Sequence, residues 1–261
     1  MSHLNQLQDE LGDRGLSVIG VTGETPAQTD PWIKEKGAKY AYAYDKGLAL
    51  MKDLGCGGFP SAVLVDSSGT VVWKGHPGSL TKDTVEEHLA GALSKPMWEW
   101  PDATKDLRKA ILKNDYSKAI ELAAALDQNE AELVTIGAAV NALVAGKATS
   151  VESAFKKGDF LTAETRGKEL SKALKGLPEA EKVDEVLAAI KADPEAKKVI
   201  KAQKALQKIA DGRDKLNRSK KVDAAVSSIQ RIIRGLEDGS FAAIQGEKMI
   251  QELEASKQNM R

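Results

Sequence analysis

The feature that most constrains the fold is a glycine-rich turn that leads through a proline into two short apolar runs. Residues 55–60 read Gly-Cys-Gly-Gly-Phe-Pro, and the runs Ser61–Val65 and Thr70–Trp73 flank a polar turn at residues 66–69. β-branched side chains favour strands, and Asp, Ser and Gly between two such runs favour a tight turn. The chain is therefore expected to pair these two segments as antiparallel strands.

The residues around this hairpin predict an alternation of helices and strands. The nearly continuous apolar run Leu16–Val21 suits a strand covered on both faces, and Tyr40–Tyr44 is a weaker strand. The predicted helices are Leu4–Leu11, Trp32–Lys36 with its cap near Thr29, Gly47–Leu54, and a closing helix capped by Thr81 with Val85, Leu89 and Leu93 on its inner face. Together these elements predict an α/β domain.

A shift in composition places a domain boundary near residue 100. Three of the four tryptophans lie between Trp73 and Trp100, whereas Asp102–Arg261 contains none and is rich in Ala, Lys, Glu and Leu. A chain of 261 residues is also long enough for two cores. We therefore expect an α/β domain at 1–95, a linker at 96–101 and an all-helical domain at 102–261.

The helical part contains a weak internal sequence repeat. Tyr116 and Phe160 each begin a predicted helix and are followed three residues later by Ala119 and Ala163, with a leucine ten residues beyond each aromatic; a third copy at Phe241 has Ile instead of Ala. Small residues at such positions let neighbouring helices approach closely, as in stacked helical hairpins. The sequence thus predicts a helical bundle with degenerate tetratricopeptide-repeat-like (TPR-like) hairpins, which serves either as a surface for a protein partner or as a packing or homodimerisation module.

Over Met1–Leu93 the order of elements, the Gly-rich turn into a proline and the hairpin that follows resemble the TlpA-like and AhpC/TSA (redoxin) branch of the thioredoxin superfamily. The resemblance implies a bacterial thiol–disulfide oxidoreductase that serves cell redox homeostasis. It also implies that Pro60 follows a cis peptide bond and that Phe59 and Pro60 lie where an extended substrate segment pairs with the backbone. Relatives with a helical extension imply a periplasmic or extracytoplasmic location.

The departure from this family is as informative as the match. The family's Cys-X-X-Cys motif lies at the end of a central strand, which pairs with the segment matching Val18 on one side and the segment matching Val63 on the other. Here the matching helix begins at about Ser2, so no position corresponds to either redox cysteine. If about ten backbone hydrogen bonds are lost at roughly 1 kcal/mol each, the lost stabilisation is comparable to the whole free energy of unfolding of an ordinary domain, which is about 5–15 kcal/mol. We expect a split sheet, explained by truncation of a longer protein, by a strand from another molecule or by re-pairing, and we favour truncation.

Few other residues suggest chemistry. Cys56 is the single cysteine; it is either a reactive thiol or, as we favour, an incidental one, and it does not match a catalytic position of the family. His3, His76 and His88 lack a second ligand at metal-binding spacing, so no metal and no other cofactor is expected. Glu24 follows a strand where a carboxylate could transfer protons beside redox cysteines, but the chain lacks those cysteines.

Charge and hydropathy limit the partners. Lys plus Arg and Asp plus Glu number 38 each, and no apolar run approaches the roughly 20 residues of a membrane span, so neither nucleic acid nor a membrane span is expected. The basic stretch Arg213–Lys221 is interpreted as a solvated helix end. Two functions remain: a member or fragment of a thiol–disulfide oxidoreductase that is inactive in dithiol exchange as it stands, or a non-catalytic thioredoxin-like scaffold with a helical interaction domain. Substrate, electron donor and oligomeric state are left open.

Overall fold

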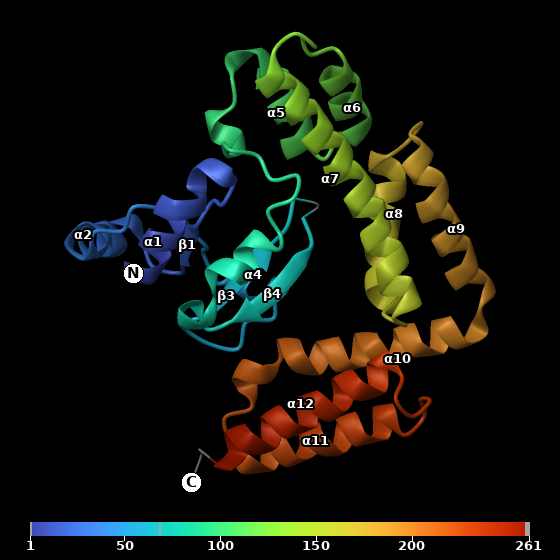
Figure 1. The fold of residues 1–261 in the computed structure, drawn as a ribbon. Helices are drawn as coiled ribbons and strands as arrows, with labels where there is room; N and C mark the ends of the chain where they lie inside the picture. Colours follow the sequence, from blue (N-terminus) through green and yellow to red (C-terminus); the bar gives the residue numbers. More distant parts are fainter. Residues whose placement is uncertain (1, 68, 259–261) are drawn as a thin grey trace. The chain divides into compact units, whose positions relative to one another are not determined.

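The computed structural model describes residues 2–67 and 69–258, so the predicted turn at 66–69 includes one residue, Ser68, that lies outside the described residues. The chain divides into two compact units, Met1–Gly146 and Lys147–Arg261 (Figure 1). This division falls within one long helix, while the linker predicted at 96–101 stays a prediction.

The first unit begins with an α/β part and ends with helices. Its helices are α1 (Ser2–Leu11), α2 (Pro26–Lys36), α3 (Ala49–Asp53), α4 (Lys82–Glu86), α5 (Lys105–Leu112), α6 (Tyr116–Ala124) and the first part of α7 (Ala131–Lys156). Its strands are β1 (Ile19–Thr22), β2 (Ala41–Tyr44), β3 (Ala62–Val65) and β4 (Val71–Gly75). Short 3-10 turns occupy Gly12–Arg14, Pro77–Ser79, Met97–Glu99 and Asp102–Thr104. The predicted order of helices and strands is confirmed.

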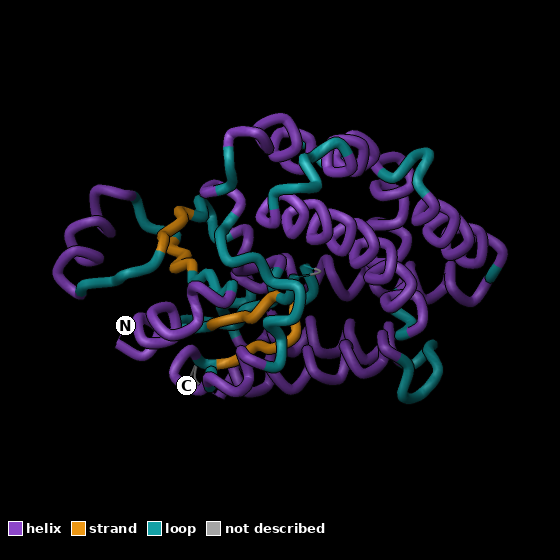
Figure 2. Tube along the Cα trace, turned by 45° about the horizontal axis from the view of Figure 1, so that its top comes forward, coloured by secondary structure: helices purple, strands orange, loops and turns teal. Residues whose placement is uncertain are grey.

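The strands form two separate two-stranded sheets, drawn in orange in Figure 2. Strand β1 pairs with β2 in parallel, with Ile19 opposite Ala41, and β3 pairs with β4 in an antiparallel hairpin, with Ala62 opposite Gly75. Within the part of the chain that the structure describes, β1 and β3 are not hydrogen-bonded to each other. The expectation of a split sheet is therefore confirmed, and the described strands do not re-pair to close it.

Two predicted helices need correction. Helix α2 begins at Pro26 and not at Trp32, because Thr25 and Gln28 form a capping box ahead of Pro26, which occupies the first helical turn. Thr29, the predicted cap, lies buried inside this helix. The earlier of two similar cap-and-proline pairs thus starts the helix.

The closing helix α4 is shorter than predicted. Thr81 caps it as expected, by accepting a hydrogen bond from the Thr84 backbone N–H, and Val85 is buried. The helix nevertheless ends at Glu86, and Gly91 has a positive φ of 73°, which turns the chain away. Leu93 consequently packs against the core of α5–α7 and not on the face that Val85 shares with Leu89.

The α/β part has one small core. It joins side chains of α1, the segment before β1, the β3–β4 hairpin and α4. Its buried members are Leu7, Leu11, Leu16, Leu64, Leu80 and Val85. Val18, directly before β1, and Trp73 in β4 pack against it. The β3–β4 sheet thus contributes directly to this cluster, whereas the β1–β2 sheet is joined to it through Leu16 and Val18, which precede β1.

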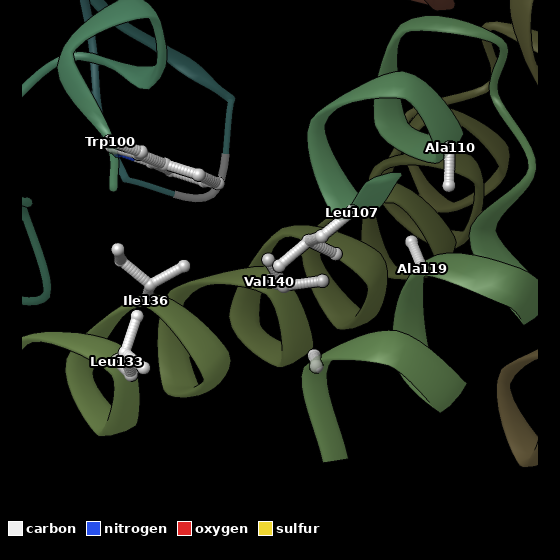
Figure 3. Packing of buried hydrophobic residues seen from close by; sticks show 8 residues of the cluster. Trp100, Leu107, Ala110, Ala119, Leu133, Ile136 and Val140 are labelled. Carbon is white, nitrogen blue, oxygen red and sulfur yellow. The ribbon is translucent and has the colours of Figure 1, made fainter. Parts of the chain in front are cut away.

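The helices that follow build a second core, with a tryptophan at one end of it (Figure 3). Trp100 lies beside Leu133 and Ile136 of α7, and its indole N–H donates to the Lys95 carbonyl at 3.1 Å. The rest of the cluster comes from α5–α7: Leu107, Ala110, Ala119, Ala123 and Val140. The segment around residues 95–100 is therefore anchored to the helical core by one buried aromatic side chain.

The second unit is entirely helical in its described residues. It contains the end of α7, α8 (Phe160–Ala173), α9 (Pro178–Ala192), α10 (Pro194–Asp211), α11 (Ser219–Ile233), α12 (Phe241–Gln258) and a 3-10 turn at Arg213–Lys215. Helices α8 and α9 pack together, as do α11 and α12. The mostly helical remainder is confirmed.

In each copy of the internal sequence repeat, the aromatic residue begins a helix. Tyr116, Phe160 and Phe241 are the first residues of α6, α8 and α12. Ala119 and Ala163 are fully buried, whereas Ile244, the divergent third copy, is 55% exposed. The predicted aromatic helix starts are therefore confirmed, while a TPR-like arrangement of the hairpins stays a prediction.

Helix α7 is long and apolar enough to cross a membrane by length and composition. A buried helix of a water-soluble core meets the same criterion, and α7 buries one continuous face, formed by Leu133, Ile136, Val140, Val144, Ala148, Val151 and Ala154. Such a face is what a core helix requires. The absence of a membrane span therefore stays a prediction.

Candidate substrate-binding turn and open sheet edges

The turn that carries Cys56, Phe59 and Pro60 connects α3 to β3. Gly55 has a positive φ of 60°, which a glycine adopts without steric cost, and it follows the last turn of α3. The Cys56 backbone N–H donates to the Met51 carbonyl at 2.9 Å. The Phe59–Pro60 peptide bond is cis, as the resemblance implied, and Pro60 leads directly into β3.

One lysine holds this turn in place. The Lys74 ammonium group, from β4, donates to the Leu54 carbonyl at 3.0 Å and also to the Gly55 carbonyl. These carbonyls belong to the end of α3, where a positive charge is favourable. Lys74 was not singled out from the sequence, because its approach depends on the hairpin register that places it opposite Val63.

The turn presents an apolar side chain and free space to solvent. The Phe59 side chain is 68% exposed, Pro60 is exposed and Cys56 is half-buried. A methyl group built on Gly57 or Gly58 would meet no heavy atom within 4 Å. A second chain could therefore approach the backbone here without a steric barrier.

The open sheet edges are the other notable feature. Strand β1 has its one described partner in β2, and β3 has its one described partner in β4, so each offers a second row of backbone N–H and C=O groups. Large apolar side chains on these strands are exposed: Ile19 is 45%, Val21 39% and Val65 48% exposed. Side chains of this kind normally lie under a neighbouring layer when strands are part of a parallel sheet.

The remaining candidates have structural contacts. The His76 ring Nδ1 accepts from the Gly78 backbone N–H at 3.0 Å and caps a 3-10 turn, and His3 Nε2 lies 2.7 Å from the Leu80 carbonyl. Exposed Glu24 accepts a hydrogen bond from the Thr29 hydroxyl at 3.4 Å. In residues 2–67 and 69–258, no cluster of three His, Cys, Asp or Glu side chains could hold a metal ion.

Comparison with known proteins connects this geometry to a family. Residues 1–74 match the model of the AhpC/TSA family. Over 90 residues, or 34% of this chain and 51% of the relative, the chain is 29% identical to the thiol-disulfide oxidoreductase ResA of Halalkalibacterium halodurans, and the ResA proteins of Bacillus anthracis and Bacillus thuringiensis subsp. konkukian match to the same extent. No solved structure matches significantly.

These comparisons support a thioredoxin-like domain of the redoxin branch in the N-terminal part. The similarity to ResA is distant, and the chain spans about half the length of the curated relatives that it matches. The matched region contains Cys56, Phe59 and Pro60 but no second cysteine. The roles of Phe59, Pro60 and Cys56 therefore stay predictions.

Proposed function

We propose that the N-terminal part of this chain belongs to a TlpA-like thiol–disulfide oxidoreductase, with Phe59 and Pro60 at the edge where an extended substrate segment pairs. The observation that carries the proposal is the exposed turn at Phe59–Pro60, which leads directly into β3, a strand that has one described neighbour and therefore an open edge. Backbone pairing of this kind gives affinity without demanding one substrate sequence. The distant similarity to ResA supports the same class of reaction.

The chain as it stands is proposed to be inactive in dithiol exchange. In that reaction one thiolate attacks the substrate disulfide to form a mixed disulfide, and a second thiol of the enzyme displaces the reduced substrate while both enzyme sulfurs become oxidised. Cys56 is the single cysteine of the chain, so it could form the mixed disulfide but could not resolve it within the same molecule. A complete cycle requires a cysteine pair supplied by another segment.

The experiment is reduction of insulin by dithiothreitol, run on the 261-residue chain and on a version extended upstream to any in-frame Cys-X-X-Cys. We expect activity only in the extended form. Its matched control replaces both cysteines of that motif by serine and should be inactive, whereas Cys56→Ser in the extended form should retain full activity. Activity of the 261-residue chain that disappears in Cys56→Ser would contradict the proposal.

The second candidate is a non-catalytic scaffold whose helices bind a protein partner. The continuous buried face of α7 and the well-packed helical unit support it, because this part of the molecule needs no cysteine pair to be stable. Inactivity of both the given and the extended chains in the insulin assay would favour this candidate.

A further inference from the structure

The second unit contains a groove that neither proposed function uses. It lies where the end of α10, the 3-10 turn at Arg213–Lys215 and the first half of α11 meet, and its volume is about 390 Å³. It is lined by Lys208, Ile209, Gly212, Lys215, Leu216, Lys221, Ala224, Ala225 and Ser228. The lining is mostly apolar, and the groove is open to solvent.

Three lysines surround this apolar floor. Among the described residues, none of Lys208, Lys215 and Lys221 forms an ion pair, whereas Lys168 and Lys198 of the same unit are each paired with a carboxylate. The Lys221 ammonium is held at the rim by the Lys215 carbonyl at 3.0 Å and by the Asn217 side-chain oxygen at 3.1 Å. The exposed basic stretch at 213–221 thus borders an apolar surface.

The open shape of the groove favours a peptide helix over a small molecule as its ligand. A small molecule is usually held by burying roughly 70–90% of its surface, which an open groove does not provide. A peptide helix needs to bury only one apolar face. The lining positions Lys221, Ala224, Ala225 and Ser228 share one face of α11 and span roughly 10 Å, or about two helical turns. The small side chains at Ala224 and Ala225 leave room for a helix to pack closely.

We propose that this groove binds an amphipathic helix of a protein partner that carries acidic residues beside its apolar face. The apolar anchors would pack against Ile209, Leu216 and Ala224, and carboxylates on the flanks would pair with the lysine rim. Opposite charges at an interface rim accelerate association and fix its register. The proposal goes beyond the redox function and does not depend on it.

The test uses a displayed library of helical peptides of about 16 residues with a fixed apolar stripe and random flanking positions. The library is selected against the full chain and counter-selected against the triple variant Lys208→Glu, Lys215→Glu, Lys221→Glu. We expect the enriched peptides to carry Asp or Glu on their flanks and to bind the triple variant about tenfold or more weakly at low salt. Binding to the unmodified chain should weaken as salt is raised.

Two further variants keep the result decisive. The triple variant Lys197→Glu, Lys201→Glu, Lys248→Glu makes the same change of net charge at exposed lysines outside the groove and should bind as the unmodified chain does. Ala224→Trp fills the groove at an exposed position without altering charge and should abolish binding. Circular dichroism checks that each variant is folded. Failure to enrich any peptide, enrichment of non-acidic peptides, or equal loss of binding in both lysine triples would overturn the proposal.

Discussion

Residues 2–74 and the second unit of this molecule differ in how completely each buries its own apolar side chains. Before residue 75 the buried apolar side chains of the described chain are Leu7, Leu11, Leu16 and Leu64. The same stretch exposes eight large apolar side chains, namely Ile19, Val21, Trp32, Tyr44, Leu50, Phe59, Val65 and Val71, whereas Ile244 is the one such residue among the described residues of the second unit. The redoxin-like part thus leaves many large apolar side chains exposed to solvent, whereas the helical part buries nearly all of its own.

The physical reason is where each kind of element finds its hydrogen bonds. A helix pairs its backbone groups within its own segment, so the second unit can complete its secondary structure without any other segment. A strand depends on neighbours, and an isolated two-stranded sheet is marginal in water. The β3–β4 sheet, which contributes Leu64 to the small core around Leu11 and Val85, therefore depends on that core, and this dependence can be measured.

The largest expected effect is a core truncation in the redoxin-like part. Leu11→Ala removes a fully buried side chain from a six-residue cluster and should cost about 2–5 kcal/mol, enough to unfold that part as a cooperative element. A urea titration followed by tryptophan fluorescence measures the loss of stability, because Trp73 packs against this cluster and contributes to the signal.

The matched change in the second unit is Leu206→Ala, at an equally buried leucine. The cavity term is of the same order, but the helical unit should stay folded because most of its core is unaffected. If both variants lose helical circular dichroism to the same extent, the proposed difference in self-sufficiency between the two regions is wrong.

A smaller effect is expected from adding a methyl group to a close-packed glycine. A Cβ on Gly246 of α12 would lie 2.3 Å from Cγ2 of Ile233, a β-branched side chain with little freedom to move. Overpacking costs about 1–3 kcal/mol, and the better helix propensity of alanine recovers up to about 1 kcal/mol. Gly246→Ala should therefore lower the thermal midpoint of the second unit in calorimetry.

Gly57→Ala is the control in the redoxin-like turn. A Cβ at Gly57 meets no atom within 4 Å, so the substitution should be neutral, or stabilising by up to about 1 kcal/mol because it restricts the unfolded chain. A loss of stability in Gly57→Ala comparable to that in Gly246→Ala would mean that the turn is packed against something.

The sequence predicts the elements of the first unit well where the signal is local. The strands of the hairpin begin within one residue of the predicted positions, because the β-branched runs and the turn residues act over a few positions. It fails at α2: the cap and proline at Thr29–Pro31 predict a helix start there, whereas the structure begins the helix at Pro26 after the Thr25 cap. Leu93 continues the apolar spacing of α4, yet the turn at Gly91 places it against another core.

The candidate sites show the same division. Phe59 and Pro60 are predicted as site residues from the family resemblance alone, because they lie within one short motif. The role of Lys74 depends on a hairpin register, and the lysine-rimmed groove depends on how α10 and α11 meet, so neither follows from spacing along the chain. Contacts between segments that are far apart in the sequence cannot be predicted directly from the pattern of residues along the chain.

Helix caps offer a finer comparison between the two units. Asp115 caps α6 by accepting from the Lys118 backbone N–H at 3.2 Å, and Asp159 caps α8 by accepting from the Thr162 N–H at 3.3 Å. Asp159 also accepts from the buried Gln203 side chain at 3.1 Å, which links α8 to α10.

Asp115→Ala should therefore cost about 1 kcal/mol, and Asp159→Ala more, because it leaves part of the Gln203 amide without its partner. Chemical denaturation of both variants measures the difference. A double variant Asp159→Ala, Gln203→Leu tests the cause, although Gln203→Leu also leaves the Leu161 N–H without its acceptor. The loss in the double variant should be smaller than the sum of the two single losses, and a strictly additive result would show that the link between Asp159 and Gln203 contributes nothing.

The smallest expected effect is electrostatic and concerns Glu10. The side-chain hydrogen bond from Lys82, followed by that from Gln6, lowers the pKa of Glu10 below its ordinary value of 4.5. A carboxyl group whose pKa is lower in the folded than in the unfolded state stabilises the fold above the unfolded-state pKa, and this contribution is lost as the pH falls through the folded-state pKa. Glu10→Gln should therefore lower the urea midpoint of the redoxin-like part slightly at pH 7. The difference from the unmodified chain should shrink as the pH falls below the ordinary pKa of Glu10 and vanish once the pH has passed its lower folded-state pKa.

Asp106 in α5 is the matched control, because Lys109 likewise lowers its pKa, but the two residues lie three positions apart on one helix. Glu10 and Lys82 belong to α1 and α4, which contribute to the same core, so their pair resists separation of those helices, whereas the Asp106–Lys109 pair supports only its own helix. Glu10→Gln should thus alter cooperative unfolding in a way that about 0.5 M salt suppresses, and Asp106→Asn should change only local helicity. An equal shift of the urea midpoint in the two variants would show that the contact between α1 and α4 adds nothing beyond a surface charge pair.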